Sequence, residues 1–71
     1  MKTPRGIEIK IGQVWEEVDP RHIWQRRVIG FGTLKNAGKV QLRGIESGRV
    51  SYARPDRFNG NRGGYRLVEE L

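Results

Sequence analysis

The chain has 71 residues and a formal net charge of +6, and it contains ten arginines but no cysteine. At this length it forms one domain at most, and the missing cysteine excludes disulfides, thiolate metal sites and a cysteine nucleophile. No apolar run approaches the ~20 residues that cross a bilayer, so we expect a cytoplasmic protein without a membrane segment.

The first part of the chain predicts a leader and then two extended segments. Residues 1–6 are expected to be a flexible leader, and the single domain is expected to span residues 7–71. Residues 7–11 alternate isoleucine with charged side chains, which predicts a strand with three isoleucines on one face. Gly12 interrupts that strand, and residues 13–18 resume an extended pattern.

A turn and a loop follow, and then a longer strand begins. Asp19-Pro20 is a turn signal because proline fixes φ and keeps the preceding residue out of the helical region. Residues 21–25 predict an irregular loop that contains His22. Residues 26–34 predict a strand in which one face carries Val28, Gly30, Gly32 and Leu34, while the other carries Arg27, Ile29, Phe31 and Thr33.

The clearest hairpin joins residues 39–45 to residues 49–54. Residues 46–48 form its three-residue loop, with Gly48 where a left-handed residue is required. This pairing places Val40, Leu42, Val50 and Tyr52 in the core. It leaves the remaining side chains together on the outer, solvent-facing side of the hairpin, namely Lys39, Gln41, Arg43, Arg49 and Ser51.

The last segments complete an all-β pattern. Residues 55–58 suit a single 3-10 turn with Phe58 as an anchor, and residues 59–64 predict an exposed loop. Residues 65–69 predict the final strand. The architecture we expect is a small SH3-like barrel of five to six short antiparallel strands, with the 3-10 turn before the last strand. An oligonucleotide-binding barrel is the alternative, although such barrels need more residues and a true helix.

Several short elements resemble a set of small bacterial and phage-type proteins with an SH3-like barrel. They are Gly12-Gln13-Val14-Trp15, Asp19-Pro20-Arg21, Arg26-Arg27-Val28, Arg57-Phe58 and Gly64-Tyr65-Arg66-Leu67-Val68. The resemblance covers most of residues 11–69 and departs from the family in the first ten residues. It implies the fold and supplies no catalytic or ligand residues.

The arginines point to an anionic partner. Residues 1–20 carry three basic and four acidic side chains, a net of −1, whereas residues 21–71 carry eleven basic and four acidic ones, a net of +7. Guanidinium presents paired donors in a plane that matches phosphate. The competing interpretation is a solvated face with local ion pairs, each worth little. The candidate nucleic-acid contacts are Arg26, Arg27, Arg43, Arg49 and Arg62.

An exposed aromatic ring beside these arginines would strengthen the prediction, because bases stack on such rings. Trp24 is the first candidate, since it lies in a polar loop just before Arg26, and Phe31 is the second. For both, the alternative is that the ring closes an open end of the barrel. We assign the remaining rings to the core or its margin: Trp15, Tyr52, Phe58 and Tyr65.

The sequence offers no catalytic or metal-binding constellation. His22 is the single histidine, and one imidazole without cysteine or clustered carboxylates does not form a metal site. Neither Ser47 nor Ser51 lies in a nucleophile motif, and Glu16 and Glu17 are adjacent, so on a strand they point to opposite faces. We therefore expect no enzymatic activity and no cofactor.

Two functional hypotheses follow, together with a third possibility. The first is a monomeric module that binds DNA or RNA through backbone phosphates, with Trp24 as the stacking residue. The second is a protein-interaction adaptor in which the loops at residues 19–27 and 59–64 receive an acidic or strand-adding protein partner. The third possibility is a self-associating or structural accessory protein.

Overall fold

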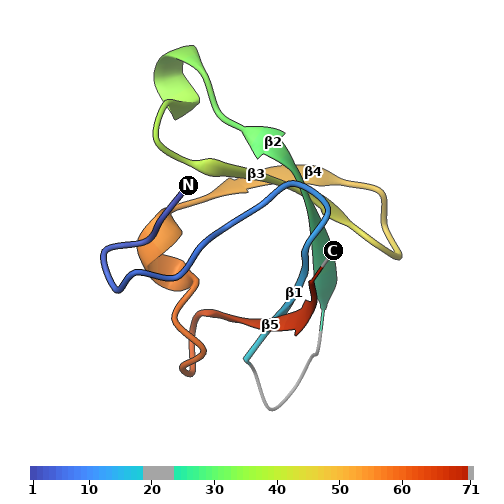
Figure 1. Ribbon diagram of the computed structural model, residues 1–71. Helices are drawn as coiled ribbons and strands as arrows, with labels where there is room; N and C mark the ends of the chain where they lie inside the picture. The colour runs from blue at the N-terminus through green and yellow to red at the C-terminus, as the bar shows by residue number, and fades with distance from the viewer. Residues whose placement is uncertain (19–23, 71) are drawn as a thin grey trace.

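Five antiparallel strands form one sheet in the order β4-β3-β2-β1-β5 (Figure 1). The computed structural model describes residues 1–18 and 24–70, so the turn predicted at Asp19-Pro20 and the loop histidine His22 lie outside the described residues. The elements are β1 (Val14–Glu17), β2 (Gln25–Phe31), η1 (Leu34–Asn36), β3 (Val40–Gly44), β4 (Val50–Ala53), η2 (Pro55–Arg57) and β5 (Tyr65–Glu69).

The all-β prediction is confirmed, including a 3-10 turn before the last strand. The sheet bends around the core, but strand pairing does not close it into a barrel. In the described part of the chain, β4 pairs only with β3 and β5 pairs only with β1, so both are edge strands. The described residues contain no helix long and apolar enough to span a membrane.

The core is centred on three aromatic rings from separate parts of the chain. The rings of Trp15 and Phe58 meet edge to face with centroids 5.0 Å apart, and the Phe58 and Tyr65 rings are also 5.0 Å apart. All three are almost completely buried, as predicted. Around them pack Ile9, Val28, Val40, Leu42 and Ala53.

The segment before β1 joins the core without forming the predicted strand. Its extended pairing is limited to a bridge between Lys2 and Glu8. Ile9 is fully buried, whereas Ile11 is 62% exposed, because Gly12 turns the chain in a left-handed conformation directly after it. The three isoleucines of residues 7–11 therefore do not share one buried face.

Residues 1–6, expected as a leader, fold back over this segment. The amide of Thr3 donates to the Ile7 carbonyl at 2.8 Å, and Thr3 is buried. The N-terminal ammonium donates to the Glu8 carboxylate at 2.9 Å. That hydrogen bond is the main reason why the pKa of Glu8 lies below its usual value.

Gln13 is a buried polar residue that ties this segment to β1. Its Oε1 atom accepts hydrogen bonds from the Lys10 amide at 2.8 Å and from Trp15 Nε1 at 3.1 Å. Its Nε2 atom donates to the Glu8 carbonyl at 3.2 Å. Because these bonds satisfy its amide in the interior, Gln13 orients the central tryptophan.

The register of the β3–β4 hairpin differs from the prediction by one residue. Arg43 lies opposite Val50, and Leu42 lies opposite Ser51, so the turn is one residue longer than residues 46–48. Gly48 has the expected positive φ, at 71°. A slip of one residue moves every side chain of a strand to the other face. Val50 and Tyr52, predicted as core, are therefore 45% and 41% exposed.

A bulge in β2 also changes a predicted face. Val28 lies opposite Leu42, but Gly30 lies opposite Gln41, so Ile29 is an extra residue in β2. After the bulge, Phe31 lies opposite the buried Val40 and packs against the core. The prediction that Phe31 shares the face of Arg27 is therefore wrong.

Candidate nucleic-acid interface

Arg27 and Arg43 lie directly opposite each other on β2 and β3. The same cross-strand row contains Val14 on β1 and Val50 on β4. Their side chains project from what we call the outer face of the sheet, the side away from the Trp15 ring. The two arginines border a shallow groove of about 350 Å³, whose other lining residues are Ile29, Gly44, Ile45 and Gly48.

The two guanidinium groups of this pair are held differently. Arg27 Nη1 donates to the Gly12 carbonyl at 2.8 Å, which orients the group and leaves its remaining N–H donors available. Arg43 is exposed and makes no side-chain hydrogen bond or ion pair with a described residue. Within the described chain, neither arginine is neutralised by a carboxylate.

Apolar and aromatic side chains lie next to this pair on the outer face. Ile45, Val50 and Tyr52 are between 41% and 48% exposed. Tyr52 lies opposite Gln41, and Gln41 Nε2 donates to the tyrosine hydroxyl oxygen at 3.3 Å. The outer face therefore combines two guanidinium groups, an exposed ring and an amide.

Arg26 has a different position from its neighbour Arg27. Because adjacent residues of a strand point to opposite faces, Arg26 shares the side of the sheet that carries Trp15. Its Nη2 atom pairs with Glu17 Oε1 at 3.1 Å, and its Nη1 atom donates to Ser51 Oγ at 3.0 Å. Arg26 thus joins β1, β2 and β4, and its charge is compensated within the domain.

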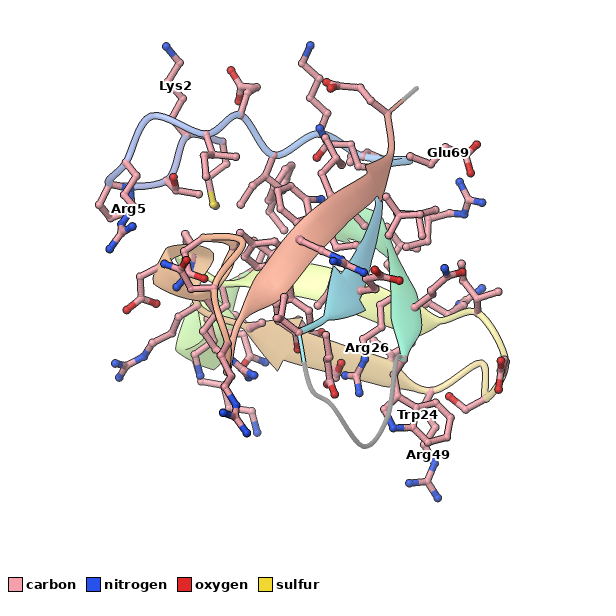
Figure 2. All side chains as sticks on the ribbon, turned by 90° about the horizontal axis from the view of Figure 1, so that it is seen from below. Lys2, Arg5, Trp24, Arg26, Arg49 and Glu69 are labelled. Atoms are coloured by element: carbon pink, nitrogen blue, oxygen red, sulfur yellow. The ribbon has the colours of Figure 1, made fainter. Side chains whose placement is uncertain are left out.

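Trp24 and Arg49 lie beside each other at one end of the sheet (Figure 2). Two backbone hydrogen bonds bring their segments together: the Ile45 amide donates to the Gln25 carbonyl at 3.0 Å, and the Gly44 amide donates to the Arg49 carbonyl at 2.9 Å. The Trp24 side chain is 42% exposed. Strand alternation places Arg49 on the side opposite to Arg43, so the two arginines do not share a face as predicted.

Arg62 lies in the loop between η2 and β5 and not on a strand of the sheet. The amide of the next residue, Gly63, donates to the Val18 carbonyl at 3.3 Å, which holds this loop against the end of β1. The nearby Arg57 stacks over the Tyr65 ring, 4.9 Å from its centroid, and donates to the Gly63 carbonyl. Of the five predicted arginines, only Arg27 and Arg43 are direct cross-strand neighbours on the outer face.

Sequence reasoning missed Tyr52 as a residue of this surface. The apolar alternation of Val50 and Tyr52 favours the core, but the length of the hairpin turn decides which face they occupy. The small residue Ala53 was the available signal. Ala53 lies opposite Val40 and is 4% exposed, so Ala53, and not Tyr52, faces the core.

The described residues hold no cluster of three or more histidine, cysteine, aspartate or glutamate side chains placed to bind a metal ion. Comparison of the chain with protein-family models, curated protein sequences and solved structures finds no significant match. The function is therefore inferred from the arrangement of these residues.

Proposed function

We propose that this protein is a non-enzymatic module that binds nucleic acid, with Arg27 and Arg43 of the outer face contacting backbone phosphates. The observation that carries the proposal is the direct cross-strand pairing of these two arginines beside an open groove. Like charges opposite each other in a sheet are destabilising. A bound phosphate would offset this repulsion, because each guanidinium presents several donors to phosphate oxygens.

The charge balance of the chain supports the same partner. Two of the acidic residues near β1 are already engaged, since Glu17 pairs with Arg26 and Glu16 pairs with Arg66. The outer-face arginines have no such described partner. Phosphate contacts of this kind give affinity that depends steeply on salt but carry no direct sequence information.

We further infer an SH3-like architecture. The strand order and the single 3-10 turn between β4 and β5 support it, because a turn of helix precedes the last strand in SH3-like barrels. The resemblance to small bacterial and phage-type proteins belongs to the same proposal. The fold by itself gives no preference between nucleic acid and protein partners.

Fluorescence anisotropy with labelled oligonucleotides tests the proposed function. We expect Kd values between about 1 and 100 µM at moderate salt, weakening as salt rises. Arg43→Ala should lower the slope of log Kd against log salt by about 0.7–0.9, the contribution of one phosphate contact.

Arg5→Ala is the matched control, because it removes the same charge from the N-terminal turn. The neighbouring Thr3 and Pro4 line a hollow with Arg54 and are not part of the groove that Arg27 and Arg43 border. Arg5→Ala should leave both affinity and slope nearly unchanged. Binding that is absent at low salt, or that Arg5→Ala weakens as much as Arg43→Ala does, would contradict the proposal.

The outer edge of β4, which pairs with no further strand in the described part of the chain, favours a second candidate function, the addition of a strand from an acidic protein partner. The hydrogen bond from the Gly44 amide to the Arg49 carbonyl determines which residues of β4 direct their backbone N–H and C=O groups toward β3. Because alternate residues of an antiparallel strand bond to the partner strand, the N–H and C=O groups of Val50 and Tyr52 point away from β3, to the edge of the sheet. Arg49 and Arg54, both exposed, flank this edge.

Proline substitution separates this second function from the first. Val50→Pro removes an N–H group that points to the free edge, so it should block strand addition while the β3–β4 ladder remains. The outer-face arginines are unchanged in this variant. Duplex binding, which depends on the unchanged arginines alone, should survive Val50→Pro. That result, together with a partner protein that is lost from nuclease-treated pull-downs, would support both functions.

A further inference from the structure

We infer that the outer face is built for single-stranded nucleic acid and that Tyr52 is its stacking residue. This inference rests on the proposed function and specifies its substrate class. It starts from the side chains around the arginine pair. A surface that contacts only phosphates gains nothing from exposed apolar groups, yet Ile45, Val50 and Tyr52 lie there with 41–48% of their surface in solvent.

The bases of a duplex are stacked on one another, and their faces are not available to a protein side chain. An unpaired base presents its whole face, and stacking on an aromatic ring stabilises it in a sequence-tolerant way. Arginine-bordered grooves with exposed rings are the usual surface for such strands. The combination of Arg27 and Arg43 with the Tyr52 ring therefore fits unpaired nucleotides better than a duplex.

The Tyr52 ring is also held in place before a ligand arrives. Gln41 Nε2 donates to its hydroxyl oxygen at 3.3 Å, and Gln41 is the cross-strand neighbour of Tyr52. A ring fixed in this way loses less conformational entropy when a base stacks on it. The Gln41 amide lies beside the ring, where it can reach the edge of a stacked base.

The spacing along the sheet matches this assignment. Gln41 is two residues from Arg43 on β3, so the amide and ring lie about 7 Å along the strand from the arginine pair. A strand that places a phosphate between Arg27 and Arg43 can therefore place a neighbouring base over Tyr52. The ring and the cations act on one nucleotide segment.

Binding of matched probes tests this inference. The probes are an oligothymidine of about ten nucleotides, an abasic oligomer of equal length and a duplex of equal length. We expect the oligothymidine to bind at least about 5-fold more tightly than either of the others. Tyr52→Ala should weaken its binding by about 5- to 100-fold and leave duplex binding unchanged, and Tyr52→Phe should restore most of the affinity.

Leu67→Ala is the control for the loss of an exposed apolar side chain, because Leu67 is also 41% exposed but lies on β5. It should bind like the wild type. As a second measurement on the unmodified protein, the Tyr52 ring protons should shift upfield in NMR spectra when the oligothymidine is added.

The outcomes separate the two proposals. Equal affinity for single strand, duplex and abasic oligomer, with an unshifted Tyr52 ring, would overturn the inference while keeping the proposed function. Binding to none of the three probes at low salt would remove both. A loss of oligothymidine binding in Leu67→Ala as large as in Tyr52→Ala would also overturn the assignment of Tyr52.

Discussion

Glu17 on β1 and Arg26 on β2 form an ion pair at 3.1 Å on the side of the sheet that carries Trp15. The adjacent Arg27 points to the outer face and lies opposite Arg43. Two consecutive arginines therefore have opposite surroundings. The charge of Arg26 is compensated by Glu17, whereas Arg27 lies opposite another positive charge.

This difference predicts that Arg26 stabilises the fold and contributes little to binding. Arg26→Ala removes the bonds to Glu17 and Ser51 and should lower the free energy of unfolding by about 1 kcal/mol. For a chain of this size the Tm should fall by about 4–8 °C. Thermal unfolding followed by circular dichroism measures the change. Oligonucleotide affinity that falls more in folded Arg26→Ala than in Arg43→Ala would refute the assignment.

Arg43→Glu should separate stability from binding. A carboxylate opposite Arg27 converts a repulsive cross-strand pair into an attractive one, worth about 0.2–1 kcal/mol. The variant should therefore unfold at a higher Tm and bind oligonucleotides much more weakly than the wild type. A lower Tm would show that the two guanidinium groups do not repel each other in the free protein.

Gly48→Val should destabilise the β3–β4 hairpin. Gly48 has φ of 71°, and no atom of the described residues lies within 4 Å of the position that a Cβ would occupy, so the cost comes from the backbone. A β-branched residue in this conformation costs more than ~1 kcal/mol. Gly48→Asn is the matched variant, since asparagine tolerates the left-handed region. Denaturant unfolding should rank wild type first, Asn second and Val last.

The register of the same hairpin can be tested by changing the size of one side chain on each of its two faces. Ala53 is buried opposite Val40, so Ala53→Leu should overpack the core and cost about 1–3 kcal/mol. Tyr52→Thr, on the exposed face, should change the free energy of unfolding far less. The reverse order would support the three-residue turn that places Tyr52 in the core.

Much of the secondary structure followed from local patterns. Alternating side chains and turn residues predicted β1 to β5, the 3-10 turn before the last strand, and the left-handed Gly48. The segment at residues 7–11 was the exception, because Gly12 redirects the chain before a ladder can form. The candidate site was predicted less well, since it depends on which strand faces combine.

Two local irregularities decided those faces. The longer turn of the β3–β4 hairpin brought Tyr52 to the outer face, and the bulge at Ile29 took Phe31 from it. Each of them shifts the strand pairing by one residue. Neither the composition nor the alternation of side chains in the sequence reveals such a shift. The shift nevertheless moves every side chain that follows it in the strand to the opposite face of the sheet.

By itself, the sequence determined an all-β domain, an aromatic core and an excess of arginine in residues 21–71, because these depend on composition and on neighbours along the chain. Only the tertiary structure decided that Arg27 meets Arg43, that Arg26 meets Glu17 and that Tyr52 reaches solvent. These relationships join different strands, and the pairing register that sets them is established only when the strands assemble around the core.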